Sequence, residues 1–517
     1  MTLLSNTFAI FLLATLAVYY FCPKRFQWIC LLVANTVFYC YSGIANIIFI
    51  LSSSLITFFA AKLVSDMNTS LKEKKAVVSK DDFKVLKTKN RNKKRLVLLG
   101  MLLLNVGVLF YLKYWRVLIG SKTLILPLGI SYYTLQAISY FMDVYNGKID
   151  KENNFAKFFL FISFFPQLIM GPINRYGNQG EQLKNPHDFD FENIKHGVML
   201  ILYGALKKYL VANMLFPRIN SILDPYYENL PGCVILFGIL LYAIYQYADF
   251  SGGIDMFLGI AELFGIKMQP NFKQPYFSTS IANFWQRWHI SLGQWMRDYI
   301  FYPFALTKAM QNFSKWCGSH LGKHFARVLP ACIANILVFM LVGVWHGPEL
   351  HFFVWGLYNG LLIAFSDILK PVFEKINCLL HINEKSKGWH VFRIIRTFIL
   401  VNIGWYFDRI VDVKQSFIYL KNTFTNFGNP MLLASQSYMR DILGRISNFE
   451  SQIVCVLIGC VFMLVVSILK ERKVDVYAAI QKKNIAFRWS AYYVMLILVI
   501  LSFTFSAGDA GFMYAQY

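Results

Sequence analysis

The stretch Leu337-Val-Phe-Met-Leu-Val-Gly-Val-Trp345 is apolar throughout and is followed directly by His346-Gly-Pro348. Apolar residues extend back to position 328, which makes the segment long enough to cross a bilayer, because a spanning helix needs roughly 20 such residues. An ionisable side chain at membrane depth is costly and usually marks a substrate or proton path. His346 is therefore the first candidate for chemistry within a membrane. The alternative is a residue that merely ends a helix before Gly347.

The composition of the whole chain agrees with a membrane protein. Of 517 residues, 56% are hydrophobic and 15% are charged, and the mean hydropathy is +0.45. These values exclude an ordinary soluble domain. They predict an all-α, polytopic integral membrane protein with about 11 to 13 buried or spanning helices. The expected segments are 3–21, 26–42, 45–64, 96–112, 155–170, 197–215, 232–250, 328–345, 351–368, 391–407, 452–469 and 488–506.

Basic residues outnumber acidic ones, 51 against 28. In so apolar a chain this excess indicates cytoplasmic loops rather than nucleic-acid binding, and we expect no nucleic-acid partner. Lys62–Arg95 carries twelve basic residues, and Lys24-Arg25 precedes it by two spans. Both lie inside only if the amino terminus is outside. We interpret the lysine-rich loop as a solvated connection near anionic lipid, with a specific binding role as the alternative.

Glycine, proline and polar residues interrupt the apolar runs of the middle of the chain. Irregular backbone at membrane depth is tolerated only where protein or a water-filled cavity satisfies it. We therefore expect helices with a basic cytoplasmic loop in residues 1–120, a catalytic core around a polar passage in 121–365, and further helices in 366–517. The interruptions are Pro127-Leu-Gly-Ile-Ser131, Gly171-Pro-Ile-Asn-Arg175, Asp249-Phe-Ser-Gly-Gly-Ile-Asp255 and Gly343-Val-Trp-His-Gly-Pro348.

A second histidine, His289, lies in an aromatic and basic segment. Ser278-Thr-Ser280 offers hydroxyl caps for a helix that begins near Ile281. Large side chains then recur at three- and four-residue spacing, which predicts one helix at the membrane interface with His289 beside its aromatic face. The alternative is a histidine that bonds a carbonyl and does no chemistry. The recurring residues are Trp285, Trp288, Leu292, Trp295 and Tyr299, with Arg287, Arg297 and Asp298 among the rest.

Other catalytic motifs find little support. The sequence has no Gly-x-Ser-x-Gly elbow, no His-Glu-x-x-His and no glycine-rich phosphate loop. His320 and His324 have the spacing of a metal-binding pair but lack a third ligand nearby, so we expect no metal site.

Several blocks resemble the signature blocks of the membrane-bound O-acyltransferases, nearest to the alginate O-acetylase type, with the D-alanyl transfer protein of teichoic acid synthesis as a close relative. The blocks are Leu126–Thr134, Asp143–Tyr145, Phe165–Pro172, Tyr247–Asp255, Asn271–Ser280, Phe284–Leu292, Arg297–Ile300 and Trp345–Gly347, and more loosely Gly511–Tyr517.

The resemblance implies a fold with a central tunnel in a bacterial plasma membrane, with His346 as the catalytic residue and His289 as a second functional histidine. It implies acyl transfer, most readily of acetyl, from a cytoplasmic thioester to hydroxyls of an extracytoplasmic polysaccharide. D-alanyl transfer to teichoic acid from a carrier protein is the alternative. The donor is acetyl-CoA or a carrier-protein phosphopantetheine, no cofactor is tightly bound, and an accessory envelope acyltransferase is an expected partner.

The residue types suit that chemistry. A histidine with a pKa near 6.5 is a suitable general base for an attacking hydroxyl at neutral pH, which is the role of His346. His289 would position the thioester or stabilise an oxyanion. We expect substrate or donor contacts from Trp285, Trp288, Trp345, Arg287, Arg297, Asp298, Asp249 and Asp255. Interface anchoring of the arginines, and pairing of the two aspartates with basic neighbours, are the alternatives.

Polar breaks and buried ionisable residues also describe a translocation path, so a transporter or flippase of envelope precursors is the competing class. The two classes differ in outcome, because an acyltransferase forms an ester whereas a transporter releases its substrate unmodified.

Overall fold

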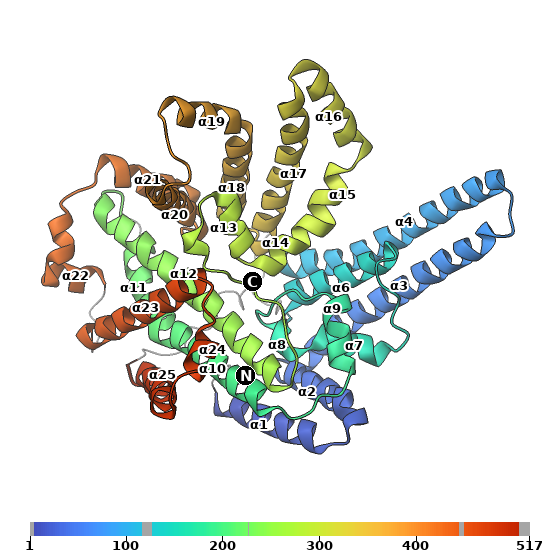
Figure 1. Cartoon of the computed structure of the whole chain (residues 1–517), viewed down its shortest axis with the longest axis horizontal. Helices are drawn as coiled ribbons and strands as arrows, with labels where there is room; N and C mark the ends of the chain where they lie inside the picture. The colour runs from blue at the N-terminus through green and yellow to red at the C-terminus, as the bar shows by residue number, and fades with distance from the viewer. Residues whose placement is uncertain (1–4, 116–126, 226, 444–448, 506–517) are drawn as a thin grey trace. The chain divides into compact units, whose positions relative to one another are not determined.

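Figure 1 shows a computed structural model of the chain, which describes residues 5–115, 127–225, 227–443 and 449–505. Within these ranges every regular element is a helix, and an isolated bridge between Phe272 and Trp288 is the one strand-like pairing. The all-α prediction is confirmed. Leu126 and the expected terminal block Gly511–Tyr517 lie outside the described residues.

Seven helices in the described ranges are long and apolar enough to cross a membrane, which confirms a multi-pass membrane protein. A further candidate is a pair of helices, Leu350–Ile368 and Lys370–Leu379, bent by 57°. The seven are Ile44–Lys75, Lys80–Tyr114, Phe191–Leu223, Gly232–Leu263, Lys323–His346, Gln452–Glu471 and Ile485–Phe503.

The prediction of about 11 to 13 helices included buried as well as spanning ones, and several of the apolar runs form helices too short to span. The run at 26–42 forms α2 (Gln27–Tyr41) of 15 residues, and the run at 3–21 forms α1 (Asn6–Phe21) of 16 residues. The run at 155–170 is divided at Phe164 between α7 (Phe155–Ser163) and α8 (Phe165–Leu168). Helices of this length fall short of the roughly 20 residues that a bilayer needs.

The chain divides into two compact units. The first unit contains the residues up to Val198 together with Phe257–Gln269, and the second contains Met199–Met256 together with the residues from Pro270 on. The division by function into 1–120, 121–365 and 366–517 stays a prediction.

In the first unit, α3 (Ile47–Lys75) and α4 (Lys80–Phe110) form a long antiparallel hairpin (Figure 1). Ser79 caps α4 by accepting a hydrogen bond from the backbone N–H of Asp82, at 3.3 Å. The other helices of this unit are α6 (Ile130–Tyr145), α9 (Tyr176–Lys184) and the first part of α10 (Phe191–Ala205).

The second unit carries both candidate histidines. Its helices begin with η4 (Leu206–Ala212), a π-helix, α11 (Asn213–Leu223) and most of α12 (Gly232–Leu263). They continue with α13 (Ile281–Arg287), α14 (Ile290–Met296), η6 (Arg297–Phe301), α15 (Tyr302–Ala305), α16 (Lys308–His320), α17 (Lys323–His346) and α18 (Leu350–Ile368). The last are α19 (Lys370–Leu379), α20 (Lys387–Arg409), α21 (Val413–Thr425), α22 (Gln436–Ile442), α23 (Phe449–Glu471), α24 (Val476–Gln481) and α25 (Ile485–Phe505).

The predicted interruption at Asp249–Asp255 is wrong, because this stretch lies inside the continuous helix α12. Its glycines serve close packing instead. A Cβ atom on Gly252 would lie 2.8 Å from the carbonyl oxygen of Gly204, and one on Gly204 would lie 2.5 Å from that of Gly252. Two backbones thus meet where each lacks a side chain.

Candidate active site

His346 is the last residue of α17, and its side chain is 5% exposed. The helix ends because Gly347 turns to an extended conformation, with φ of −170°. The loop that follows is tightly packed, since a Cβ atom on Gly347 would lie 2.5 Å from the ring of Phe352. His346 is therefore both a helix-ending residue and a buried ionisable group.

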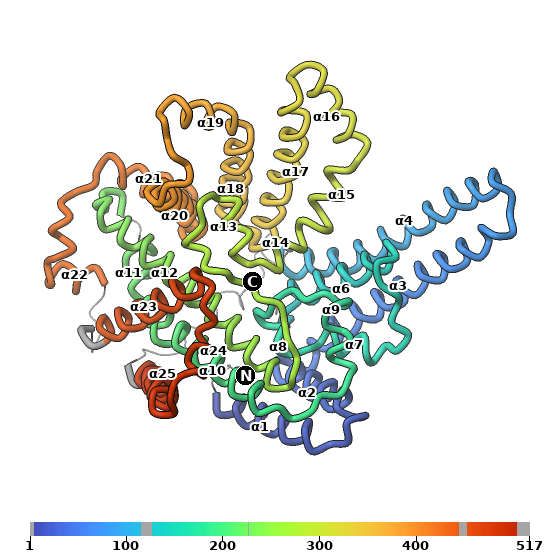
Figure 2. Tube along the Cα trace, in the orientation of Figure 1, coloured from blue at the N-terminus to red at the C-terminus, as the bar shows by residue number. Residues whose placement is uncertain are grey.

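The helices α17 and α18 lie side by side (Figure 2). Glycines allow them to pack closely. A Cβ atom on Gly343 would lie 2.3 Å from the carbonyl oxygen of Phe352, and one on Gly356 would lie 2.3 Å from that of Phe339. Because Gly343 precedes His346 by about one helical turn, this close approach fixes the depth of the imidazole against α18.

Aromatic side chains surround the His346 imidazole. The ring centroids of Trp345, Trp355 and Phe352 lie 5.1, 5.4 and 6.0 Å from its own. Trp285 joins this group, since its ring lies 5.4 Å from that of Trp355 and its Nε1 donates to Oδ1 of Asn359 at 3.1 Å. The site is thus a mainly apolar enclosure in which a few polar groups are held in place.

The helix predicted from Ile281 to Tyr299 is broken at His289. As expected, Ser280 caps the first part, where its Oγ accepts from the backbone N–H of Asn283 at 3.1 Å. The chain then leaves helical geometry, because His289 has φ of +47° and ψ of 51°. This left-handed conformation costs a non-glycine residue about 1 to 3 kcal/mol, and such strain clusters at functional sites. The prediction of one continuous helix is therefore wrong.

A segment outside the predicted helix causes the break. The backbone N–H of Lys273 donates to the carbonyl of Arg287 at 2.9 Å, and that of Ile290 donates to the carbonyl of Asn271 at 3.0 Å. These contacts replace the hydrogen bonds that a continuous helix would have made around His289.

Asn271 also binds the imidazole of His289. Its side-chain Nδ2 lies 3.3 Å from His289 Nδ1, and its Oδ1 accepts from the backbone N–H of Ser291 at 2.9 Å. Both side chains are buried. Asn271 lies in one of the blocks that resemble the family, but local sequence patterns do not indicate its role because its partner lies 18 residues further on.

Trp345 lies between the two histidines. Its ring centroid is 6.2 Å from that of His289 and 5.1 Å from that of His346. Phe250 of α12 covers another side of His289, with ring centroids 4.8 Å apart. The structure therefore brings His289, His346 and Trp345 into one cluster, to which Trp285 and Trp288 also belong through stacked and edge contacts.

Burial sets the charge of His289, which lies outside the candidate membrane spans. Desolvation disfavours the imidazolium ion and lowers the pKa of His289 to about 3. The ring is neutral at physiological pH, so it acts as a fixed hydrogen-bonding group rather than as a cation.

The two aspartates of α12 pair with basic neighbours. Asp249 Oδ1 lies 2.5 Å from Lys208 Nζ, with both side chains 0% exposed, and Asp255 Oδ2 lies 2.5 Å from Lys207 Nζ. Lys207 also donates to Ser251 Oγ at 2.9 Å. These pairs join η4 to α12, so the pairing alternative describes their contacts in the structure, and their expected role towards substrate stays a prediction.

The arginines lie at the edge of the site. Arg287 Nη1 is 2.8 Å from Oε2 of Glu471, at the end of α23. Arg297 and Asp298 pair with each other at 3.2 Å on an accessible surface of η6. Their expected contacts with a donor also stay predictions.

The pair His320 and His324 does not share a helix. α16 ends at His320, Gly322 turns with φ of +94°, and α17 starts at Lys323. His320 Nδ1 bonds the carbonyl of Trp316 at 2.9 Å and His324 Nε2 bonds that of Ile368 at 3.3 Å. The helical spacing read from the sequence is therefore not realised.

Comparison with known proteins agrees with the resemblance. The model of the membrane-bound O-acyltransferase family matches residues 148–312, a range that contains Asn271 and His289 and ends before His346. The chain is 30% identical over 421 residues to a probable alginate O-acetylase of Pseudomonas syringae pathovar tomato, covering 78% of this chain and 71% of the relative.

Two further relatives act on other envelope polymers. One is a peptidoglycan O-acetyltransferase of Helicobacter pylori, 28% identical with 65% of this chain and 66% of the relative covered. The other is a teichoic acid D-alanyltransferase of Bacillus subtilis, 30% identical with 60% and 77% covered. These similarities favour the acyltransferase over the transporter, and the spans are consistent with a bacterial plasma membrane. The chain belongs to the membrane-bound O-acyltransferase family and is a multi-pass membrane enzyme of cell-envelope acyl transfer.

Proposed function

We propose that this enzyme transfers an acetyl group from a cytoplasmic thioester to hydroxyls of an extracytoplasmic envelope polysaccharide, with His346 as the general base. One observation carries the proposal. A buried histidine ends a membrane-spanning helix and is joined through Trp345 to a second buried histidine whose strained backbone is held by Asn271.

In the reaction, the oxygen of the acceptor hydroxyl attacks the carbonyl carbon of the thioester. A C–O bond forms, the C–S bond breaks, and the sulfur leaves as a thiolate. His346 accepts the hydroxyl proton as the attack proceeds and returns it to the thiolate, so that the imidazole ends the cycle unchanged.

His289 stabilises the oxyanion in this scheme. Nδ1 of His289 lies 3.3 Å from Nδ2 and 3.4 Å from Oδ1 of Asn271. In the proposed scheme Nδ2 donates to Nδ1, and the ring proton is on Nε2. A neutral Nε2–H donor suits a carbonyl oxygen that gains negative charge, and a preorganised donor of this kind is worth about 3 to 4 kcal/mol in other acyl transfers.

Acetyl is the favoured group because the probable alginate O-acetylase matches 78% of this chain. D-alanyl transfer to teichoic acid is the second candidate, supported by the Bacillus subtilis relative, 77% of which is covered. For acetyl transfer the donor is acetyl-CoA or an acetylated carrier-protein phosphopantetheine, and for D-alanyl transfer it is a carrier-protein thioester. An extracytoplasmic acyltransferase is an expected partner in either case.

Mass spectrometry of envelope polymers tests the proposal. A deletion strain complemented with the wild-type gene should show an acetyl ester on its polysaccharide, and complementation with His346→Ala should not. The matched control is His390→Ala, at an exposed position of α20, which should restore the ester. An alanyl ester in place of acetyl would select the second candidate, and an ester restored by His346→Ala would refute the role of His346.

A further inference from the structure

The hairpin α3–α4 continues well beyond its apolar segments. The apolar part of α3 ends near Val64 and that of α4 starts at Leu96, while both helices run on without a break to Lys75 and from Lys80. At 1.5 Å per residue, the polar part of α4 extends about 24 Å past its apolar part. We call residues 65–95 the hairpin extension.

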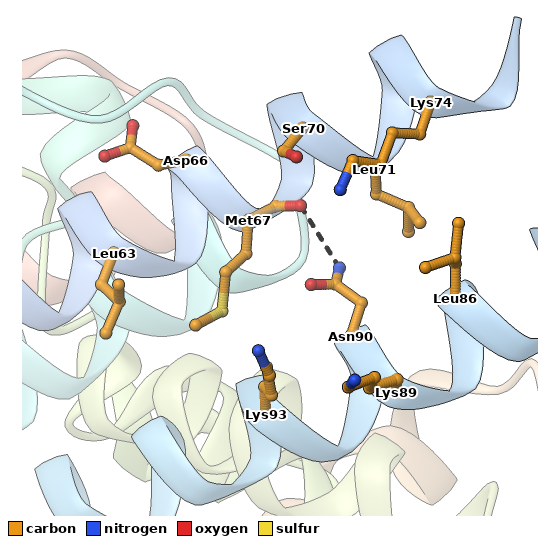
Figure 3. Close-up of a pocket in the computed structure, with 10 residues that line it drawn as sticks. All are labelled: Leu63, Asp66, Met67, Ser70, Leu71, Lys74, Leu86, Lys89, Asn90 and Lys93. Atoms are coloured by element: carbon orange, nitrogen blue, oxygen red, sulfur yellow. Dashed lines mark hydrogen bonds between the residues drawn. The ribbon is translucent and has the colours of Figure 1, made fainter. Parts of the chain in front are cut away.

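Hydrogen bonds hold the two helices of the hairpin in register. Within the apolar part, Ser53 Oγ donates to Asn105 Oδ1 at 2.5 Å. In the extension, Asn90 Nδ2 donates to the carbonyl oxygen of Met67 at 3.3 Å, as Figure 3 shows. Lys94 Nζ donates to Asn68 Oδ1 at 2.8 Å. The extension is therefore a preformed surface whose binding needs no helix formation.

The charge of this surface is strongly positive. Lys62–Arg95 holds twelve basic residues and four acidic ones. Two of the four carboxylates form ion pairs, Asp81 with Lys84 and Asp66 with Lys151, and Asp82 accepts a hydrogen bond from Ser79 Oγ. Eleven of the twelve cations are exposed. The excess is thus available to a partner of opposite charge.

A cavity of about 410 Å³ opens between the two helices of the extension (Figure 3). Its lining combines four apolar side chains with three ammonium groups and with the carboxylate of Asp66, which pairs with Lys151. The lining residues are Leu63, Asp66, Met67, Ser70, Leu71, Lys74, Leu86, Lys89, Asn90 and Lys93. Among the described residues, no ion pair engages Lys74, Lys89 or Lys93.

The distance by which the extension projects beyond the apolar segments favours a soluble partner over the lipid surface. Headgroups occupy about 5 to 8 Å on each side of the hydrocarbon, and charges are screened over about 8 Å at physiological salt. Lys62, Lys93 and Arg95 lie within that layer. Lys74, Lys80, Lys87 and Lys89 lie about 10 to 24 Å beyond the apolar segments, which places them past the headgroups.

Nucleic acid fits this surface less well. Single-stranded binding surfaces combine cations with aromatic rings on which bases stack. The extension contains one aromatic residue, Phe83, and its four carboxylates are interspersed among the cations.

We propose that the hairpin extension is a docking surface for an acidic soluble protein on the cytoplasmic side of the membrane. Carboxylates of the partner meet the distal lysines, and an aliphatic side chain enters the cavity. In the scheme above, which this part of the inference rests on, that protein carries the acyl thioester. Docking itself does not require the acyl-transfer step, so His346→Ala should bind the partner as the wild type does.

Binding to the full chain in neutral phosphatidylcholine nanodiscs tests the proposal. The probe is the holo acyl carrier protein of bacterial fatty acid synthesis, a small and strongly acidic helical protein. We expect binding that weakens as salt is raised, and an affinity lowered about tenfold or more in a variant with Gln at Lys74, Lys80, Lys87 and Lys89.

Two variants serve as controls. Gln at Lys62 and Arg95 removes cations at headgroup depth that do not line the cavity, and Gln at Lys375, Lys385 and Lys387 removes exposed cations elsewhere. Both should bind the carrier within threefold of the wild type, and thermal melting should show that all variants fold.

Wild-type protein that does not bind the carrier, or a loss equal in the proximal and distal variants, would refute the docking surface. Capture of phosphatidylglycerol vesicles through the distal lysines without carrier binding would show a lipid-binding hairpin instead. Carrier binding in a protein that forms no ester would refute the proposed function and leave the docking surface intact.

Discussion

Asn271 binds the imidazole of His289 through its side chain, with Nδ2 of the asparagine 3.3 Å from Nδ1 of the histidine. The same asparagine accepts the backbone N–H of Ser291 at 2.9 Å, so one side chain fixes both the ring and the start of α14. A strained, buried histidine is thus oriented by a residue that never needs to contact the substrate. Asn271 is a positioning residue.

Asn271→Ala should lower the rate of acyl transfer by about tenfold or more, because it removes the partner of His289 Nδ1 and the cap of α14 at a typical cost of 1 to 3 kcal/mol. Transfer measured with purified, folded protein gives the result. Asn377→Ala, at a less buried position of α19, is the control and should keep the wild-type rate. If Asn271→Ala transferred the acyl group at the wild-type rate, Asn271 would not be a positioning residue for His289.

Acidification should destabilise the wild type more than His289→Gln. The folded pKa of His289 is about 3, below the ordinary value of 6.5, so the unfolded chain takes up a proton first as the pH falls. The stability contributed by the neutral ring is complete above pH 6.5 and falls by about 1.4 kcal/mol per unit between pH 6.5 and 3.

Thermal melts in detergent at pH 7.5 and pH 5.5 measure this difference. The wild type should lose more melting temperature between the two values than His289→Gln, which has no group to titrate at this position. Equal losses in the two proteins would show that residue 289 is not buried in the neutral form.

Local patterns predicted much of the fold. Apolar runs indicated the membrane helices, and the hydroxyl cap at Ser280 lies where the sequence placed it. The break at His289 was not predictable from helical spacing, since it depends on backbone hydrogen bonds that Lys273 donates and Asn271 accepts. The spacing of side chains reflects only the residues of the helix itself. It does not show that another segment will form hydrogen bonds with the same backbone N–H and C=O groups.

The aspartates of α12 show the same limit. The polar stretch Asp249-Phe-Ser-Gly-Gly-Ile-Asp255 suggests an interruption of the helix. In the structure, Lys207 and Lys208 pair with its two carboxylates, and Gly252 packs closely against the backbone of Gly204. The neighbour that stabilises a polar stretch within a helix is more than 40 residues away, so the sequence alone indicates polarity and not its partner.

Gly343→Ala should reduce acyl transfer by roughly tenfold to a hundredfold, because its Cβ would lie 2.3 Å from the carbonyl oxygen of Phe352 and displace the end of α17 that carries His346. The melting temperature should also fall. Gly388→Ala is the matched control, since nothing lies within 4 Å of the added Cβ. If both variants behave alike, close packing of α17 against α18 does not position His346.

Asp249→Asn should lower the yield of folded protein strongly, because loss of one partner of a buried ion pair typically costs 3 to 5 kcal/mol. Replacing both Lys208 and Asp249 with Met and Leu should recover much of that loss, since both side chains are 0% exposed. Size-exclusion profiles of the extracted protein report the yield. A double variant that folds no better than the single one would show that the pair is needed as charges.

The central claim is that His346 removes a proton from an acceptor hydroxyl inside the membrane. Its most direct test is ester formation by the purified enzyme in liposomes, with an acetyl thioester on one side and polysaccharide on the other. We predict ester product with the wild type and with His390→Ala, and none above background with folded His346→Ala. Wild-type amounts of ester from His346→Ala would contradict the account.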